Sequence, residues 1–188
     1  MKHKFKEGRE TFPINMKRYE VIYADPPWRY EHPVSNSRKI ENQYPTMELE
    51  EIKKLQVPSA ENSVLFLWAT APKLQEALEV MLSWGFTYRS CLVWDKEIIG
   101  MGYWFRNRHE LLLVGIKGKF SPPKATERIS SVVRFKREKH SQKPKYIRRM
   151  IGNWYSNNSK LEMFARERME GWDCFGNEVP ETIQKVLT

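Results

Sequence analysis

The sequence predicts an α/β protein whose mostly parallel sheet is doubly wound, with helices on both faces. Two observations point to this class. Apolar segments of strand length lack the strict alternation of a half-exposed sheet, and amphipathic helical segments separate them. The chain has 188 residues, a length that fits one domain. We therefore predict a single domain over residues 1–188, with a basic N-terminal extension at 1–18 and a basic, loop-rich segment at 117–143.

The first elements are two short apolar strands with a helix between them. Glu20–Ala24 reads EVIYA and stops at a Pro-Pro turn, which is typical of a buried strand. Ser63–Ala69 is apolar over most of its length and predicts a second buried strand. Between the two strands, Thr46 is predicted to cap a helix that runs to about Leu55, because a threonine side chain can accept a bond from the first turn.

The following elements alternate in the same way. Pro72 is predicted to open an amphipathic helix that Gly85 ends. The apolar face predicted for this helix consists of Leu74, Ala77, Leu78, Met81 and Leu82. Another helix begins at Pro144, and its predicted face consists of Ile147, Met150, Ile151 and Trp154. The remaining apolar or β-rich segments predict strands at Thr87–Trp94, Glu110–Ile116, Ile129–Phe135 and Leu161–Phe164.

The composition limits the partners and the location. There are 32 Lys and Arg against 23 Asp and Glu, a net charge of +9, which predicts a polyanionic partner and favours nucleic acid over a membrane surface. We expect no membrane span, because no apolar run reaches the necessary length of about 18 residues. The two cysteines form no CxxC pair and the four histidines have no ligand spacing. We therefore expect no metal and a reducing, cytoplasmic location.

The positive charge is concentrated in one part of the chain. Residues 117–149 contain twelve Lys or Arg and two acids, and the rest of the chain is close to neutral. We predict that this part contacts phosphates through Lys136, Arg137 and Lys139. The alternative interpretation is a solvated loop with a positive helix start.

The first predicted strand ends in Asp25-Pro26-Pro27-Trp28, at the edge where doubly wound sheets bind ligands. The prolines make a stiff turn that offers carbonyl acceptors, Asp25 adds a carboxylate, and Trp28 adds a flat face. Together they suit the exocyclic amine of a base, whose two protons they can accept while the ring stacks. Holding both protons favours the nitrogen geometry that attacks an electrophile. The alternative is a structural turn with a capping aspartate and a core tryptophan.

This DPPW motif resembles the signature of the N(6)-adenine methyltransferase family, which includes the catalytic subunit of the eukaryotic messenger-RNA adenosine methyltransferase and bacterial and phage enzymes. Further segments resemble family motifs, in the family's order, from about residue 19 to residue 179. They are YPTM at 44–47, LFLWAT at 65–70, RNRHE at 106–110, HSQKP at 140–144, FAR at 164–166 and GWDCFGNE at 171–178. The resemblance implies a Rossmann-like methyltransferase sheet with a circularly permuted motif order, in which the catalytic strand comes first and the cofactor strand last.

The resemblance also implies S-adenosylmethionine as the methyl donor and roles for individual residues. Asp25 and the Pro26 carbonyl would hold the target amine. Positions that would line the cofactor are Asp25, Lys143, Arg166, Asn177 and Glu178. Positions that would lie near the acceptor base are Trp28, Tyr44, Asn107 and Glu110. The alternative interpretations of Asn107, Glu110 and Lys143 are a strand-entry cap, a solvated charge and a basic-surface residue.

These observations predict methylation of the exocyclic amino group of adenine in DNA, by direct in-line transfer and without a metal. In duplex DNA the base would have to be flipped out of the stack. The preference for DNA comes from the resemblance to small bacterial and phage members. The same reaction on RNA is the alternative, and a non-catalytic nucleic-acid-binding subunit is a further one. A monomer or homodimer is expected, with a partner subunit as an alternative.

Overall fold

The computed structural model describes residues 17–30, 46–100, 102, 104–136, 142–176 and 179. In these ranges the centre of the molecule is a seven-stranded sheet in the order β5-β3-β4-β2-β1-β6-β7. Its strands are β1 (Tyr19–Ala24), β2 (Ser59–Thr70), β3 (Thr87–Asp95), β4 (His109–Lys117), β5 (Val132–Arg134), β6 (Lys160–Met163) and β7 (Asp173–Phe175). Neighbouring strands are parallel except at β4, which runs antiparallel to β2 and β3. The predicted, mostly parallel sheet is confirmed.

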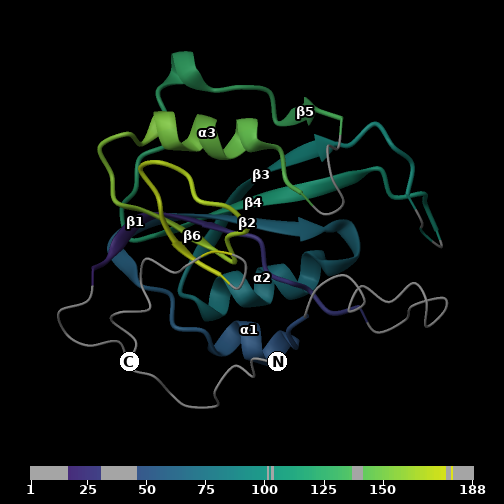
Figure 1. Ribbon diagram of the computed structural model, residues 1–188, viewed down its shortest axis with the longest axis horizontal. Helices are drawn as coiled ribbons and strands as arrows, with labels where there is room; N and C mark the ends of the chain where they lie inside the picture. The colour runs from purple at the N-terminus through teal and green to yellow at the C-terminus, as the bar shows by residue number, and fades with distance from the viewer. Residues whose placement is uncertain are drawn as a thin grey trace.

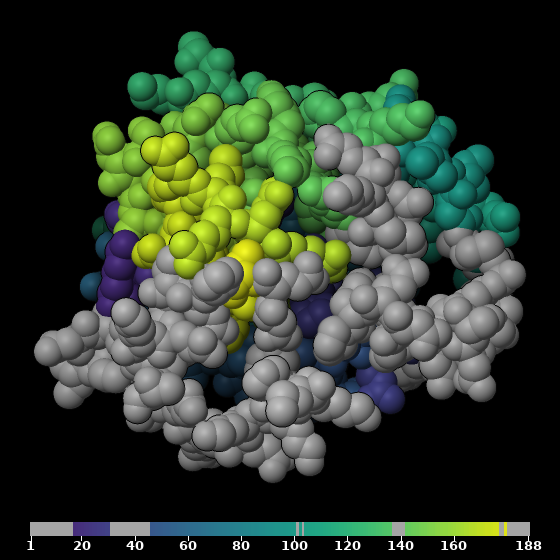
Figure 2. Space-filling view, in the orientation of Figure 1, coloured from purple at the N-terminus to yellow at the C-terminus, as the bar shows by residue number. Residues whose placement is uncertain are grey.

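Helices cover both faces of this sheet, as predicted. They are α1 (Leu49–Lys54), α2 (Leu74–Ser83) and α3 (Lys145–Trp154), with short 3-10 turns at Ala71–Lys73 and Ala125–Glu127. Figure 1 shows α3 on one face and α1 and α2 on the other. In the same orientation, Figure 2 shows green and yellow side chains, from α3 and the chain around it, covering the upper part of the molecule. Among the described helices, none has the length and apolar character needed to cross a membrane.

Strand β1 lies between β2 and β6 and is buried on both faces. Ile22 and Ala24 belong to the core beneath α1 and α2, whereas Val21 and Tyr23 belong to the core beneath α3. Because successive side chains of a strand point to opposite faces, two cores require apolar residues at every position. The central place of β1 therefore explains its continuous apolar sequence and puts the residue after it, Asp25, in the middle of one sheet edge.

The start of α1 differs from the prediction. The N-cap is Glu48, not Thr46, and the helix spans Leu49–Lys54. The Glu48 side chain accepts a bond from the backbone of Glu51, and the Glu51 carboxylate accepts one from the Glu48 N–H at 2.9 Å. This reciprocal capping box satisfies two helix-end donors at once, which the single cap at Thr46 would not.

The apolar face of α2 also differs from the prediction. Ala77 and Met81 are buried as expected, but Leu74 and Leu78 are exposed at the helix surface and Leu82 is 73% exposed. The buried row is Ala77, Val80, Met81 and Trp84, which also has the i, i+3, i+4, i+7 spacing. Its last member is a tryptophan whose ring N–H donates to the Ile52 carbonyl at 3.0 Å, so burial of the large aromatic sets the rotation of the helix.

The C-terminal part follows the prediction with three differences. Helix α3 buries Ile147, Met150 and Ile151 as predicted. Strand β6 ends at Met163, because Phe164 has a positive φ of 62° that no strand continues. Strand β7 was not predicted, since three residues carry no periodic signal. Strand β5 occupies only the centre of the predicted segment Ile129–Phe135.

Candidate active site

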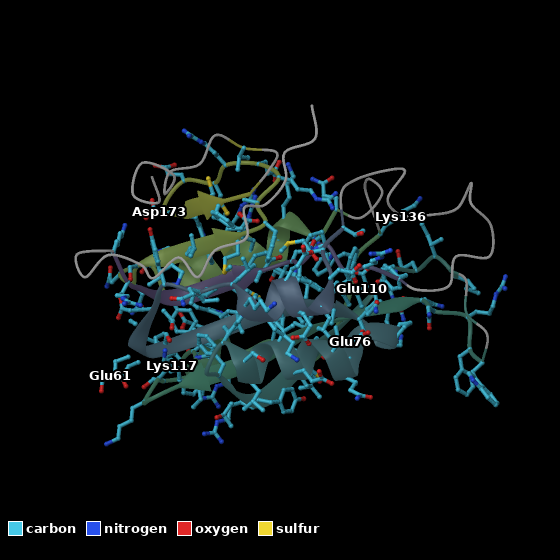
Figure 3. The ribbon with its side chains drawn as sticks, turned by 90° about the horizontal axis from the view of Figure 1, so that it is seen from below. Glu61, Glu76, Glu110, Lys117, Lys136 and Asp173 are labelled. Atoms are coloured by element: carbon cyan, nitrogen blue, oxygen red, sulfur yellow. The ribbon has the colours of Figure 1, made fainter. Side chains whose placement is uncertain are left out.

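The site is assembled at the edge of the sheet where β1, β2 and β6 end. Asp25 follows β1 and Arg166 follows β6 by three residues. Glu110 reaches the same edge because β4 is reversed, so that its second residue pairs with Thr70 at the end of β2. In Figure 3, Glu110 lies well away from Lys117 and Asp173, which mark the opposite edge at the end of β4 and the start of β7. The sequence-predicted Asp25, Glu110 and Arg166 therefore meet at one edge.

Asp25, Lys143, Glu110 and Lys96 form a chain of alternating charges that we call the ion chain. The Lys143 Nζ lies 2.8 Å from the Asp25 carboxylate and 3.3 Å from the Glu110 Oε2. The Lys96 Nζ donates to the Glu110 Oε1 at 3.1 Å. All four side chains are largely removed from solvent, where charges persist only if they are paired. Lys143 is thus a buried bridge between two carboxylates, not a basic-surface residue.

The pKa values of the two carboxyl groups in the ion chain are shifted in opposite directions. Burial raises the pKa of Asp25 above its usual value, although the charge of Lys143 opposes this. Burial also acts on Glu110, but the ammonium groups of Lys143 and Lys96 bring its pKa below the usual range. Two carboxyl groups with separated pKa values in one site are typical of groups with different chemical roles.

Lys143 stays protonated in this environment. Burial by itself would lower its pKa, but the Asp25 and Glu110 carboxylates hold that pKa above its usual value. Its ammonium also lies 5.6 Å from the centre of the Trp68 ring, within the range of a cation–π contact. A permanent cation at this point keeps both carboxylates oriented.

One buried acceptor of Glu110 and one of Gln142 have no hydrogen-bond donor among the described residues. They are the Glu110 Oε2, whose contact with Lys143 is an ion pair without hydrogen-bond geometry, and the Oε1 of the adjacent Gln142. A buried acceptor without a donor costs about 1–3 kcal/mol. Such acceptors suit a ligand that brings N–H groups, such as an ammonium or an exocyclic amine. The donor-rich ends of S-adenosylmethionine and of adenine both fit this set.

The Asp-Pro-Pro-Trp turn is rigid and its tryptophan is packed. The Trp28 N–H donates to the Pro26 carbonyl, and the Met47 N–H donates to the Pro27 carbonyl, each at 2.9 Å. Each carbonyl keeps a second lone pair for a ligand. The Trp28 side chain is 6% exposed, and its ring N–H donates to the Trp68 carbonyl at 3.1 Å. Trp28 therefore belongs to the core beneath α1 and α2, and its stacking on adenine stays a prediction.

The loop after β6 is held in one conformation by close backbone packing. Phe164 adopts the left-handed region, and the Ala165 N–H donates to the Phe175 carbonyl at 3.0 Å. A Cβ at Gly176 would lie 2.5 Å from the Ala165 N and O. The loop thus packs directly against the end of β7, and only glycine at 176 leaves room for it. Arg166 is held at the sheet edge by this loop.

A second buried ion-pair network supports the same loop. Arg148 of α3 pairs with Glu162 of β6 and donates to the Glu167 Oε1 at 2.9 Å. The Lys145 Nζ also donates to the Glu167 carboxylate, at 2.8 Å. Burial raises the pKa of Glu162 to about 7, with Arg148 acting against it. The sequence predicted Arg148 only as one of the basic residues of 117–149, because no neighbouring residue indicates that this helix cation is buried.

A cavity of about 190 Å³ adjoins the ion chain. It is lined by Tyr30, Thr70, Ala71, Pro72, Lys96, Gly100, Asn107 and His109. Asn107, predicted near the acceptor base, is part of this wall. Tyr30 and His109 were not predicted, although Tyr30 follows the DPPW turn by two residues and His109 precedes Glu110. The Tyr30 hydroxyl is fixed by a 2.7 Å hydrogen bond with the Thr70 hydroxyl.

In the described part of residues 117–149, the basic side chains do not all lie beside the site. Lys117 lies at the opposite edge, where its Nζ donates to the Ser59 hydroxyl at 3.0 Å. Arg148 and Lys143 are committed to carboxylates. Of the predicted phosphate contacts, Lys136 is exposed and lies toward the Glu110 end of the molecule in Figure 3.

Several predicted site residues lie outside the described residues: Tyr44, Arg137, Lys139, Asn177 and Glu178. Within the part of the chain that the structure describes, no group of three or more His, Cys, Asp or Glu side chains could hold a metal ion. The described site presents paired carboxylates, lysines and backbone carbonyls.

Comparison with known proteins connects the chain to a family. The MT-A70 family model matches residues 19–178. The chain is 34% identical to the Type II methyltransferase M.MunI of a Mycoplasma species, over 95% of this chain and 86% of that protein. It is 30% identical to an Arabidopsis thaliana N(6)-adenosine-methyltransferase MT-A70-like protein and 28% identical to the human N(6)-adenosine-methyltransferase catalytic subunit METTL3. Each match covers 86% of this chain, which spans 24% and 28% of those two longer proteins.

Proposed function

The chain belongs to the MT-A70 family, and on that premise we propose that it transfers a methyl group from S-adenosylmethionine to the exocyclic amino group of adenine in DNA. Its relatives carry the names of methyltransferases, several of them N(6)-adenosine-specific. The choice of DNA is supported by the bacterial Type II methyltransferase, which this chain matches over most of both lengths. RNA is the second candidate, because the longer eukaryotic relatives are named for adenosine.

The observation that carries the proposal is the pair of carboxylates that Lys143 holds at the end of β1. The Asp25 and Glu110 carboxylates are hydrogen-bond acceptors, and the Lys143 Nζ lies 2.8 Å from the first and 3.3 Å from the second. An adenine amine brings two N–H donors and an amino-acid ammonium brings three. Two carboxylates at the end of β1 offer acceptors for such donors.

The roles of the residues follow from their places. S-adenosylmethionine, when bound, supplies the methyl group for a direct in-line transfer. Asp25 and the free lone pair of the Pro26 carbonyl accept hydrogen bonds from the two N–H groups of the target amine, which favours a pyramidal, more nucleophilic nitrogen. As the N–C bond forms and the methyl–sulfur bond breaks, the amine loses one proton, which Asp25 can take up. Because burial raises its pKa, Asp25 is also a stronger proton acceptor than an ordinary aspartate.

We further propose that Lys143 orients both carboxylates and keeps one N–H for the carboxylate of the cofactor. An ammonium has three donors; one donates to Asp25 at 2.8 Å, and the Glu110 carboxylate lies 3.3 Å from the Nζ as an ion pair. Arg166, Asn177 and Glu178 would contact the remainder of the cofactor, with Asn177 and Glu178 suited to ribose hydroxyls. Tyr44, Trp28 and Asn107 would frame the adenine.

The proposal is tested by methyl transfer from labelled S-adenosylmethionine to duplex DNA, single-stranded DNA and RNA in parallel, followed by nucleoside analysis. We expect N(6)-methyladenine in DNA at a higher rate than in RNA, with no product from the Asp25→Ala variant. A preference for RNA would select the second candidate. Nucleic-acid binding without transfer to any substrate would indicate a non-catalytic subunit. The cytoplasmic location and the monomeric or homodimeric state stay predictions.

A further inference from the structure

We propose that the segment between β3 and β4 is an aromatic wedge that enters duplex DNA beside the target adenine. We call this segment, residues 96–108 apart from 101 and 103, the arm, and its tip is Trp104 and Phe105. The inference rests on the proposed function, because it assigns the arm to the same nucleic-acid substrate. It adds a group that opens the duplex, which the ion chain does not supply.

The arm is a rigid extension of the β3–β4 pair. The Lys96 N–H donates to the Arg108 carbonyl at 3.0 Å, and the Gly100 N–H donates to the Asn107 carbonyl at 2.8 Å. Near the tip, a Cβ at Gly102 would collide with the Phe105 carbonyl, so the backbone turns tightly there. Backbone hydrogen bonds therefore join the two sides of the arm as far as Gly100 and Asn107.

The base of the arm is fixed by charge. The Arg108 guanidinium donates to both carboxylate oxygens of Asp95, at 2.7 and 2.8 Å. Arg134 of β5 donates to the same carboxylate at 3.2 Å. A bidentate arginine–carboxylate pair fixes orientation as well as distance.

The tip consists of two neighbouring aromatic side chains that are open to solvent. Trp104 is 94% exposed and Phe105 is 84% exposed. Each exposes a large apolar surface to water, and two such residues in sequence at the end of a rigid arm are typical of a contact surface. Aromatic rings in this state suit stacking on bases or insertion between them.

The arm and the active site share a wall. Gly100 and Asn107 of the arm line the cavity together with Tyr30, which follows the DPPW turn. Lys96, at the base of the arm, is the last member of the ion chain. Figure 1 shows the chain between β3 and β4 extending beyond the sheet, and Figure 2 shows its teal side chains at the margin of the molecule. A nucleic acid whose base reaches Asp25 would pass this arm.

Charge favours a nucleic acid over an apolar protein surface as the occupant. The exposed side chains next to the tip include Arg106 and Arg108. Lys136, which is also exposed, follows the end of β5 by two residues. A base in a duplex must be unstacked and flipped to reach a catalytic pocket, at a cost of a few kcal/mol. Apolar wedges inserted at a base step offset such costs in other DNA-binding proteins. The aromatic tip and the neighbouring Arg106 supply insertion and phosphate contact together.

The test compares the double variant Trp104→Ala/Phe105→Ala with the wild type on one DNA preparation, either duplex or heat-denatured. We expect kcat/KM to fall about 10-fold or more on duplex DNA and less than about 3-fold on denatured DNA, because a single strand needs no opening. Leu82→Ala is the matched control. It removes another exposed apolar side chain, 73% exposed on α2, and should change neither value.

Two further measurements separate the wedge from other roles of the tip. The salt slope of duplex binding should stay unchanged, because the double variant removes no charge. Equal decreases on both DNA forms, or no decrease on either, would overturn the wedge. A smaller oligomer of the variant in light scattering would overturn it too, in favour of a protein contact. A wild type that methylates no nucleic acid would defeat the proposed function itself, whereas an active wild type with an unaffected variant would defeat only the wedge.

Discussion

The ion chain and the arm lie at the same sheet edge but are built in opposite ways. In the ion chain, each described charge faces an opposite charge within 3.3 Å, and the side chains are largely buried. In the arm, backbone bonds fix the main chain while two aromatic side chains remain in water. The ion chain is held by strand ends and by the start of a helix, which position side chains rigidly. The arm is a loop, and we propose that its exposed aromatic side chains contact the substrate.

The largest expected effect is at Asp25. Asp25→Ala should reduce methyl transfer by about 1,000-fold or more, because it removes the acceptor that lies nearest the end of β1. Thermal unfolding should change little, since Lys143 keeps Glu110 as a partner. The measurement is kcat with labelled cofactor, with circular dichroism as the control for folding. Asp25→Asn is the matched variant, which keeps the shape but loses the charge. Robust turnover by either variant would remove Asp25 from the catalytic role.

The next effect concerns the pH dependence of the ion chain. Asp25 acts as an acceptor when ionised, so activity is present above its pKa and is lost as the pH falls through it. Burial raises this pKa and Lys143 lowers it. Lys143→Met should therefore raise the pKa of Asp25 further and move the acid limb of the kcat profile to higher pH, by about one unit or more.

Lys96→Met is the control for that shift. Lys96 contacts Glu110 and not Asp25 in the described site, so its removal should move the acid limb less. Profiles of log kcat against pH for the three proteins decide the question. If the Lys143 variant titrated like the wild type, the ion chain would not set the protonation of the reacting group.

A smaller effect is expected at the loop that follows β6. Gly176→Ala would bring a Cβ to 2.5 Å from the Ala165 backbone and displace the loop that carries Arg166. We expect KM for S-adenosylmethionine to rise about 10-fold, equivalent to about 1.4 kcal/mol, with a smaller change in kcat. Gly152→Ala is the control, since its Cβ would meet only the Trp172 side chain, at 3.1 Å or beyond. An unaltered KM in a folded Gly176 variant would show that the loop does not hold the cofactor.

The smallest effect concerns the basic segment. Changing Lys136, Arg137 and Lys139 to Glu should flatten the salt dependence of duplex binding, by up to about 0.9 in slope for each phosphate that the variant no longer neutralises. Lys119→Glu is the control, because Lys119 is exposed just after β4, at the opposite edge. Fluorescence anisotropy at several salt concentrations measures the slope. The solvated-loop interpretation gains support if the triple variant and the wild type give parallel lines.

Local features of the site were readable from the sequence. The apolar run of β1 and the turn after it lie next to each other in the chain, so the position of Asp25 at a strand end required no tertiary information. The buried face of α3 was also predicted, since Ile147, Met150 and Ile151 recur at helical spacing. The rotation of α2 was not, because two apolar rows compete on that helix and a tryptophan beyond its end decides between them.

The sequence by itself determined the fold class, the Asp-Pro-Pro-Trp turn and the family motifs, because these depend on neighbouring residues and on periodicity. Only the tertiary structure decided that Lys143 bridges Asp25 and Glu110, since Lys143 is 118 positions from Asp25. That meeting requires β4 to run against β2, which places Glu110 at the carboxyl edge. A buried apolar run predicts a strand but not its direction. Its apolar side chains can pack against a core whether the strand is parallel or antiparallel to its neighbours.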